Sequence, residues 1–299
     1  MNTDKLSFAV LYLCRKANPI WKSRGFLHSF FGNDPGDSYP LYFLHKGYDE
    51  GEYDAALDEL TPDQRARIRY LWIDDTGMDK RAYAKACRQI TGFSHLLIMN
   101  SNAIIHSKNW AELYQRALLE TQGRALIGAT GSWEAMTSIG VTFPNPHIRT
   151  TAFLVDRMRF LEAYGDERFT KRDSYLMESG PDSLTNMYLA SGDPVLVLDN
   201  KGQLFEPKDW ATSKTYRSAN QENLLVGDLK TFRFHYLTRR RRLDISGRCW
   251  GEEKSATGGF FLSWIPFRIW YKHLYSGFRF KFLARLLKKA KSKKPANSA

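Results

Sequence analysis

The chain has 299 residues, enough to bury a sizeable core in one large domain or in one domain with an appendage. Its hydrophobic content of 43% is ordinary for a globular protein, and no apolar run approaches the roughly 20 residues that span a bilayer. The net charge of +12 is concentrated after Glu253, where eleven Lys or Arg residues and no Asp or Glu occur. The sequence therefore predicts a nearly neutral globular body with a basic tail.

The three cysteines are Cys14, Cys87 and Cys249. Because they are scattered and odd in number, they fit neither a disulfide framework nor a zinc site, and we expect reduced thiols in a cytoplasm. The polar start of the chain, and the basic Arg15-Lys16 that follows the apolar run Leu6–Cys14 without a cleavage site, predict that no signal peptide is present.

In the first 130 residues, apolar runs of strand length alternate with segments of helical character. This alternation predicts an α/β fold with a mainly parallel sheet. The expected strands are Leu6–Leu13, Tyr39–His45, Arg69–Ile73, His95–Met99 and a short Ala125–Ile127. The expected helices are Gly25–Phe31, Ala55–Arg69 with an internal start at Thr61-Pro62, Met78–Ile90 and Lys108–Glu120.

The second half is less regular. Ala152–Tyr164 has the pattern of a strand that runs into a helix, and Ser183–Ala190 that of a helix stopped by Ser191-Gly192-Asp193-Pro194. Val195–Leu198 is expected to be another strand, and Glu206–Gln221 a polar loop.

Two features point to chemistry. The fourth strand ends abruptly in Asn100-Ser101-Asn102, and an isolated acid, Glu178, is expected at the start of a helix about eighty residues later. Open α/β sheets form ligand sites at the carboxyl ends of their strands. An acid that lies beside such a site can act as a base.

The order of these segments resembles the GT-A fold of inverting, family-two-like bacterial glycosyltransferases, over roughly residues 5–235. The motifs that carry the resemblance are Thr76–Tyr83, Asn100–Asn102, Ala129–Glu134, His147–Thr150, Met177-Glu178 and Phe205–Trp210. The resemblance implies a GT-A-like, Rossmann-like sheet flanked by helices, and a role in making bacterial surface polysaccharides.

In that fold the fourth strand ends in an Asp-x-Asp motif whose carboxylates hold Mg²⁺ or Mn²⁺ on the donor diphosphate. Here Asn100, Ser101 and Asn102 occupy those positions, and amides bring no charge. The resemblance thus assigns these three residues to donor binding, while the cofactor and the metal ligands stay unknown. A simple strand-ending turn is the alternative interpretation of the same residues.

The resemblance places five further residues at the donor. Acids after the second and third strands, here Asp49, Asp75 and Asp79, would bind the base or ribose, and Arg81 would reach a phosphate. Capping, turn formation or pairing with an acid are the alternatives. Arg217, with its neighbours, would close over the diphosphate as a flexible lid, whereas a solvated loop is the plainer interpretation.

The resemblance assigns Glu178 as the base that deprotonates the acceptor hydroxyl, with Asp182 as its competitor. Interaction of Glu178 with the dipole of a helix start is the alternative. Trp133, His147 and Arg149 lie where acceptor-binding loops occur in the fold. Trp133 would stack on a sugar, although a single tryptophan is more commonly a core residue.

Residues 236–299 form the predicted second domain, after a GT-A-like domain over 1–235. The segment combines the run Arg239–Arg242 with many aromatic and basic residues, the composition of an interfacial amphipathic helix attracted to anionic lipid. Binding of nucleic acid and packing of the aromatic residues onto the body are the alternatives.

Together these features predict a cytoplasmic enzyme, peripheral on the inner face of a bacterial inner membrane. It would move a sugar from a nucleotide-sugar donor to a lipid-linked or growing cell-surface glycan, with inversion. A second hypothesis is a catalytically degenerate GT-A module that binds glycan or a partner enzyme. A third is a nucleic-acid-binding protein, against which the nearly neutral body argues.

Overall fold

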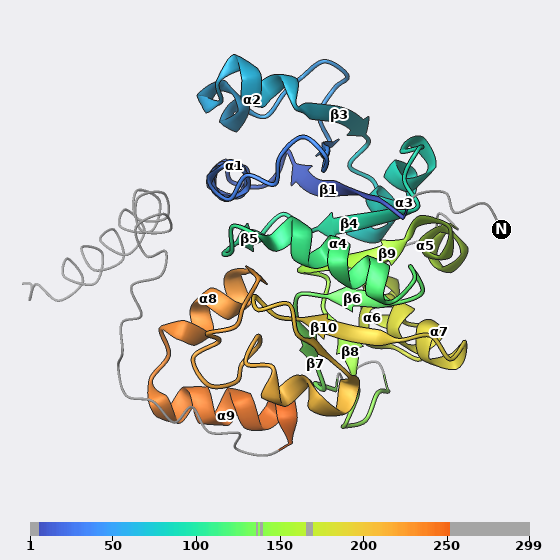
Figure 1. Cartoon of the computed structure of the whole chain (residues 1–299), viewed down its shortest axis with the longest axis vertical. Helices are drawn as coiled ribbons and strands as arrows, with labels where there is room; N and C mark the ends of the chain where they lie inside the picture. The colour runs from blue at the N-terminus through green and yellow to red at the C-terminus, as the bar shows by residue number, and fades with distance from the viewer. Residues whose placement is uncertain (1–5, 136, 138–139, 166–169, 252–299) are drawn as a thin grey trace, which may run out of the picture.

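A single mixed sheet lies at the centre of the computed structural model, which describes residues 6–135, 137, 140–165 and 170–251. The eight strands follow the order β11-β10-β6-β9-β4-β1-β2-β3, and most of them run down Figure 1 from β3 to β10. Neighbouring strands are parallel except where β9 and β11 are involved. The strands are β1 (Phe8–Arg15), β2 (Leu41–Lys46), β3 (Ile68–Ile73), β4 (His95–Met99), β6 (Leu126–Gly128), β9 (Ala152–Asp156), β10 (Val195–Leu198) and β11 (Leu204–Phe205). The predicted mainly parallel α/β sheet is thus confirmed.

Strand β9 is antiparallel to both of its neighbours, β4 and β6. Its first residues therefore lie beside the carboxyl ends of those two strands. The Asn100 amide donates to the Thr151 carbonyl (3.1 Å), and the Ala129 amide to the Ala152 carbonyl (2.9 Å). The reversal adds the segment before β9 to the edge of the sheet where parallel strands form ligand sites.

Helices cover both faces of the sheet (Figure 1). The α-helices are α1 (Trp21–Gly32), α2 (Pro62–Ala66), α3 (Asp79–Gln89), α4 (Trp110–Glu120), α5 (Arg157–Tyr164), α6 (Lys171–Ser179), α7 (Leu184–Ala190), α8 (Leu229–His235) and α9 (Arg239–Trp250). Two 3₁₀ helices, η1 (Ala55–Glu59) and η3 (Pro207–Thr212), and two short ladders complete the described chain. The ladders pair β5 (Ile104–Ile105) with β12 (Val226–Gly227), and β7 (Gly131–Ser132) with β8 (His147–Ile148).

The alternation of side chains along β1 separates two hydrophobic layers, because successive residues of a strand point to opposite faces. Val10 and Tyr12 pack with α1 and α4, and the Tyr12 ring stacks on Phe26 at 3.7 Å. Ala9 and Leu11 belong to the layer formed with α3, α5 and α7. Both faces of the central strands are fully buried, which explains their continuous apolar runs.

The segment expected as one helix over Ala55–Arg69 is two short helices followed by the first residues of β3. Thr61 forms a capping box with Gln64 and starts α2, so the internal helix start is confirmed. The helix ends after Ala66 because Ile68 already pairs with Leu41 in the sheet. The predicted end of the helix was therefore three residues too late.

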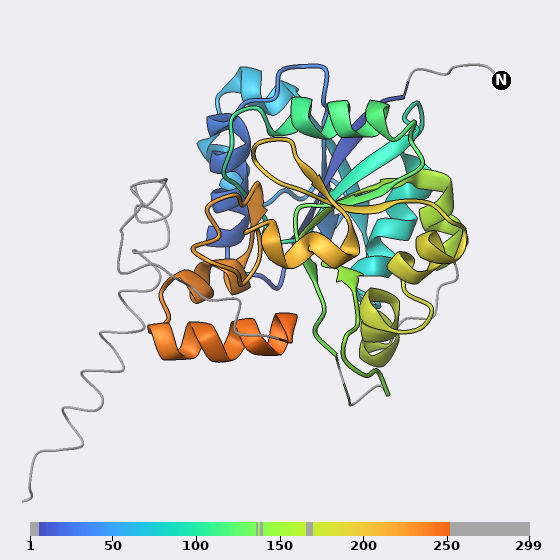
Figure 2. The ribbon, with the colours of Figure 1, turned by 60° about the horizontal axis from the view of Figure 1, so that its bottom comes forward.

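Helix α9, which lies at the bottom of Figure 2, packs onto the body through its last turn. Cys249 and Trp250 are buried, and the Trp250 indole donates to the Tyr216 carbonyl (3.2 Å). Residues 236–251 of the segment predicted as a tail thus contact the core. The aromatic and basic remainder, 252–299, lies outside the described residues, and its membrane role stays a prediction.

Two close approaches fix the chain at the end of β6 and in the turn after it. A side chain at Gly131 would place its Cβ 2.4 Å from the buried Trp210 ring, and at Gly128 2.5 Å from Ile148. Only glycine allows the chain to pass this tightly between the sheet and η3. Within the described ranges, no helix combines the length and the hydrophobicity that crossing a bilayer requires.

Candidate functional site

Charged residues follow the parallel strands at their common carboxyl edge. Arg15 ends β1, Lys46 ends β2, and Asp75 comes just after β3. The Asp75 carboxylate accepts two hydrogen bonds from Arg15 (2.7 and 2.8 Å) and one from the buried Lys46 (2.8 Å). The Arg15 and Lys46 hydrogen bonds lower the pKa of Asp75 well below its usual value. Asp75 is therefore an ionised acid whose negative charge is compensated by two cations that partly enclose it.

Three other residues were predicted to bind the nucleoside or a phosphate of the donor, and they do not lie around Asp75. Asp49 is exposed. Arg81 turns to Asp74, at 2.8 Å. Asp79 begins α3 and accepts a hydrogen bond from Ser174 (3.3 Å), which joins it to α6. Donor binding by these residues stays a prediction.

The Asn100-Ser101-Asn102 segment forms a tight turn at the end of β4. The Asn102 amide donates to Asn100 Oδ1 (2.8 Å), and the Tyr12 hydroxyl donates to the Ser101 carbonyl (3.3 Å). Asn102 Oδ1 is buried without a hydrogen-bond partner among the described residues. This geometry matches the strand-ending turn that was the alternative interpretation of the sequence.

The same edge does not fit a carboxylate-held divalent ion. Mg²⁺ and Mn²⁺ prefer several oxygen ligands that include carboxylates. In the described ranges, no three His, Cys, Asp or Glu side chains come together in a group that could hold a metal. The Asn100 side-chain oxygen already accepts the Asn102 amide. The side chains available as metal ligands therefore do not support the metal site that the GT-A resemblance implies.

Glu178 lies in the last turn of α6, whereas the sequence suggested the start of a helix. That expectation was wrong because Thr170 caps the helix eight residues earlier, in a capping box with Asp173. A helix dipole disfavours an acid at this end, so the dipole interpretation of Glu178 is excluded. Asn145 donates to the Ser179 carbonyl (2.8 Å) and ties the end of α6 to the chain before β8.

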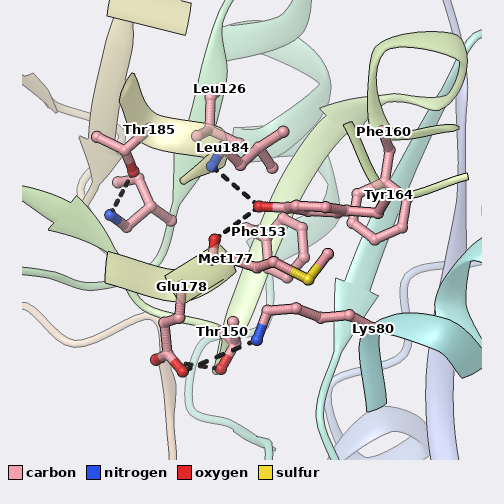
Figure 3. Close-up of a pocket in the computed structure, with 11 residues that line it drawn as sticks. Lys80, Leu126, Thr150, Phe153, Phe160, Tyr164, Met177, Glu178, Leu184 and Thr185 are labelled. Atoms are coloured by element: carbon pink, nitrogen blue, oxygen red, sulfur yellow. Dashed lines mark hydrogen bonds and ion pairs between the residues drawn. The ribbon is translucent and has the colours of Figure 1, made fainter. Parts of the chain in front are cut away.

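A small pocket opens beside Glu178 (Figure 3). Lys80, Thr150 and Glu178 form its polar side, while its remaining lining is mainly apolar and includes Phe153 and Tyr164. Thr150 donates to Glu178 Oε1 (3.4 Å), and Lys80 Nζ lies 4.0 Å from Glu178 Oε2. The Glu178 side chain is 25% exposed, so the carboxylate is both fixed and reachable.

Basic side chains from three parts of the fold act on this carboxylate. Burial raises the pKa of Glu178, but Lys80, His147, Arg149 and Lys230 lower it, and the net shift is downward. Glu178 is therefore ionised at neutral pH, the state in which a carboxylate accepts a proton.

His147, on β8, and Arg149, just after it, both lie close enough to Glu178 to lower its pKa. His147 is buried and donates from Nδ1 to the Asn145 carbonyl (2.8 Å), and burial lowers its pKa. Arg149 is also buried and pairs with Asp228 at 2.7 Å. The structure thus brings both predicted acceptor residues to the predicted base, while their role in acceptor binding stays a prediction.

Arg217 reaches the same region from the segment after η3. Its guanidinium pairs with Glu134 and lies 4.9 Å from the centre of the Tyr216 ring, which also contacts Arg149 at 4.0 Å. The Tyr216 side chain is fully buried, so this residue belongs to the core and not to a flexible lid. Arg217 itself has a left-handed backbone (φ 46°), an unfavourable conformation that the surrounding packing maintains.

Trp133 and Asp182 are the two remaining residues that were predicted for the site. The Trp133 indole donates to the Pro207 carbonyl (2.9 Å), and its ring contacts Trp250 edge to face at 5.5 Å. The half-buried ring therefore supports the fold on one side, and stacking on a sugar stays a prediction. Asp182 is exposed in the turn between α6 and α7. Of the two acids proposed as base, only Glu178 lies in the pocket.

Sequence reasoning missed several residues of the site. Arg15 and Lys46 are polar residues at the ends of buried apolar runs, the same signal that identified Asn100, and could have been found from it. Lys80 and Asp228 have no comparable signal, because each comes close to Glu178 or Arg149 only through the packing of separate elements.

No protein-family model and no curated protein matches the sequence of this chain. Several solved structures resemble it in outline. The galactosyltransferase LgtC with donor and acceptor sugar analogues is 11% identical, with a TM-score of 0.40 over 64% of this chain and 74% of that one. GalNAc-T7 with UDP, GalNAc and Mn²⁺ is 10% identical, with a TM-score of 0.44 over 68% and 42%. HddC from Yersinia pseudotuberculosis is 12% identical, with a TM-score of 0.37 over 62% and 98%.

Proposed function

We propose that this protein is a glycosyltransferase that moves a sugar from a nucleotide-sugar donor to a hydroxyl of a glycan or lipid-linked acceptor. The observation that carries the proposal is the environment of Glu178. An ionised, partly exposed carboxylate lies near the carboxyl edge of a mainly parallel sheet, among cations suited to a diphosphate.

The proposed reaction is a single displacement. The acceptor oxygen forms a bond to the anomeric carbon of the donor sugar, and its proton passes to Glu178. The bond between that carbon and the diphosphate oxygen breaks, so the nucleoside diphosphate leaves with the electron pair. Attack opposite the leaving group inverts the anomeric centre.

The leaving diphosphate needs compensating positive charge. Since the described residues do not suit a carboxylate-held metal, we assign this role to fixed cations. The guanidinium of Arg217 lies 4.9 Å from the centre of the Tyr216 ring, and Lys230 lies near enough to influence the Glu178 charge. Guanidinium groups bind phosphate oxygens in a two-pronged geometry that an ammonium lacks.

The proposed setting of the reaction is based on composition. The basic, aromatic segment 252–299 is proposed to hold the enzyme on an anionic membrane, at the cytoplasmic face of a bacterial inner membrane. A lipid-linked or growing cell-surface glycan would be within reach there. Trp133, His147 and Arg149 are proposed to contact that acceptor.

A panel of nucleotides and nucleotide sugars tests the proposal by thermal shift, with EDTA and with Mn²⁺. A shift with one nucleotide sugar, followed by its transfer to an acceptor glycan, is the expected result. Binding without transfer would favour the degenerate module, for which the closed turn at Asn100–Asn102 is the favouring observation. If no nucleotide or nucleotide sugar stabilises the protein, the proposal is wrong.

A further inference from the structure

Lys80 is a buried charge beside the predicted base. Its side chain is only 3% exposed, although lysine is rarely buried without a partner. It follows Asp79 at the start of α3, on a different element from Glu178, which ends α6. Its ammonium lies 4.0 Å from a carboxylate oxygen of Asp79 and 4.0 Å from one of Glu178.

Ser174 fixes the direction of this ammonium. Lys80 Nζ donates to the Ser174 hydroxyl (3.1 Å), and that hydroxyl donates to Asp79 (3.3 Å). Ser174 lies one helical turn before Glu178 on α6, so the same helix presents both the anchor of the lysine and its ionic partner. Figure 3 shows Lys80 reaching from α3 across the pocket toward Glu178 and Thr150.

The other groups that face Glu178 either bond to other partners or are exposed to solvent. Arg149 pairs with Asp228, and His147 donates to a backbone carbonyl. Lys230 is exposed at the start of α8, and the buried hydroxyls of Tyr83 and Tyr164 feel the Glu178 charge without bonding to it. Lys80 combines burial with an ion-pair contact to the carboxylate.

We propose that Lys80 is a positioning residue, which keeps the Glu178 carboxylate ionised and directed toward Thr150 by a charge held out of water. This inference rests on the proposed role of Glu178 as the base. A fixed cation about 4 Å from a carboxylate, screened little by solvent, lowers the pKa of the acid by roughly 1–3 units. Lys80 would thereby extend the working range of the base to lower pH.

The test replaces Lys80 by Met, which keeps length and removes charge, and replaces Lys85 by Met as the matched control. Lys85 lies on the same helix but pairs with Asp74, away from Glu178. Glutamate labelled with ¹³C at the carboxyl carbon reports the ionisation of Glu178 by NMR, and its signal is assigned by its loss in Glu178→Gln. The pH profile of sugar transfer is recorded for the same proteins.

In Lys80→Met we expect the pKa of Glu178 to rise by roughly 1–3 units, and the acidic limb of kcat/KM to move up with it. Lys85→Met should leave both unchanged, and Lys80→Arg should restore them in part. An unchanged Glu178 titration in folded Lys80→Met overturns the inference, whatever the activity. A raised pKa in Lys80→Met, when the wild-type protein itself transfers no sugar, supports the electrostatic role and shows that the proposed function has failed instead.

Should Lys80→Met not fold, Ser174→Ala removes the anchor of the ammonium and leaves the charge in place. A rise in the Glu178 pKa in that variant, smaller than the full effect of the charge, supports the inference. No change of the Glu178 pKa in folded Ser174→Ala, together with failure of every Lys80 variant to fold, assigns Lys80 to stability alone and overturns it.

Discussion

Arg149 and Asp228 form a buried ion pair at 2.7 Å, with side chains only 5% and 7% exposed. Asp228 also accepts from the Thr151 hydroxyl (2.8 Å) and from backbone amides of α8, which it caps. One carboxylate thus joins the segment before β9 to the start of α8. Since Arg149 directly precedes Thr150, which lines the pocket and donates to Glu178, the pair also fixes the chain at the edge of the candidate site.

Removal of one partner of this pair should be strongly destabilising. Asp228→Asn leaves the Arg149 charge buried and weakens the cap of α8, so we expect a loss of about 3–5 kcal/mol in the free energy of unfolding. Urea denaturation measures it. The control is Asp244→Asn, which breaks the exposed pair with Arg248 and should cost less than about 1 kcal/mol. Equal losses of unfolding free energy in the two variants would contradict the assignment of Arg149 and Asp228 as a stabilising buried pair.

The same pair predicts a pH dependence of stability. Burial raises the pKa of Asp228, but Arg149, the Thr231 amide and the Thr151 hydroxyl lower it from 3.8 to about 2. Because the folded carboxyl binds its proton less readily than the unfolded one, its contribution is fully present above about pH 4 and is lost as the pH falls toward 2. The stability difference between wild type and Asp228→Asn should shrink over that range. A constant difference would mean that this carboxyl is not the source.

Glu178→Gln tests the base. The amide keeps the shape of the side chain but cannot take a proton, so turnover should fall by roughly 10²–10⁴-fold while donor binding is retained. Asp182→Asn is the matched control, since that acid is four residues away and exposed. Near-normal transfer by Glu178→Gln, with a large loss in Asp182→Asn, would move the role to Asp182.

Donor binding should survive chelation. If fixed cations neutralise the diphosphate, EDTA should leave the donor Kd unchanged, while Arg217→Ala should weaken it by roughly tenfold or more, the loss of a charge-assisted contact. Lys208→Ala, an exposed cation on η3 paired with Glu206, serves as the control. Calorimetric titration with the donor measures the Kd and distinguishes fixed cations from a metal site. Affinity that collapses in EDTA and is unaffected by Arg217→Ala would restore a metal site.

The basic segment after Glu253 should be the membrane anchor. The full chain is expected to float with anionic liposomes and to detach only in part at high salt, because apolar insertion survives screening. A chain that ends at Glu253 should stay unbound. That end point retains Cys249 and Trp250, which belong to the core, so loss of binding would not reflect unfolding. Equal flotation of both chains would rule out the segment as anchor.

Much of the fold could be predicted from the sequence, because the buried strands are short apolar runs bounded by polar turns. His95–Met99 and Val195–Leu198 coincide with the observed β4 and β10. The antiparallel direction of β9 could not be read from its own residues, since strand direction depends on its neighbours. Helix α6 was missed because its composition is polar, although Thr170 and Asp173 carry the spacing of a capping box.

The candidate site was predicted in part. Glu178, His147 and Arg149 were all selected from the sequence, and in the structure the two basic residues lower the pKa of Glu178. The ion pairs of Asp75 with Arg15 and Lys46 were not predicted, because these residues meet only where three separate strands end. Pairwise contacts between distant segments are set by tertiary packing, and a single sequence carries little record of them.

The close contact between Gly131 and Trp210 offers a way to find relatives of this protein. Overall identity fades quickly between distant homologues, but a backbone that touches an indole ring leaves no room for any other residue. Gly128, pressed against Ile148, is subject to the same constraint. A search pattern of two glycines three positions apart at the end of a short apolar strand, followed later by a buried tryptophan, should detect members that share the fold when whole-chain comparison does not.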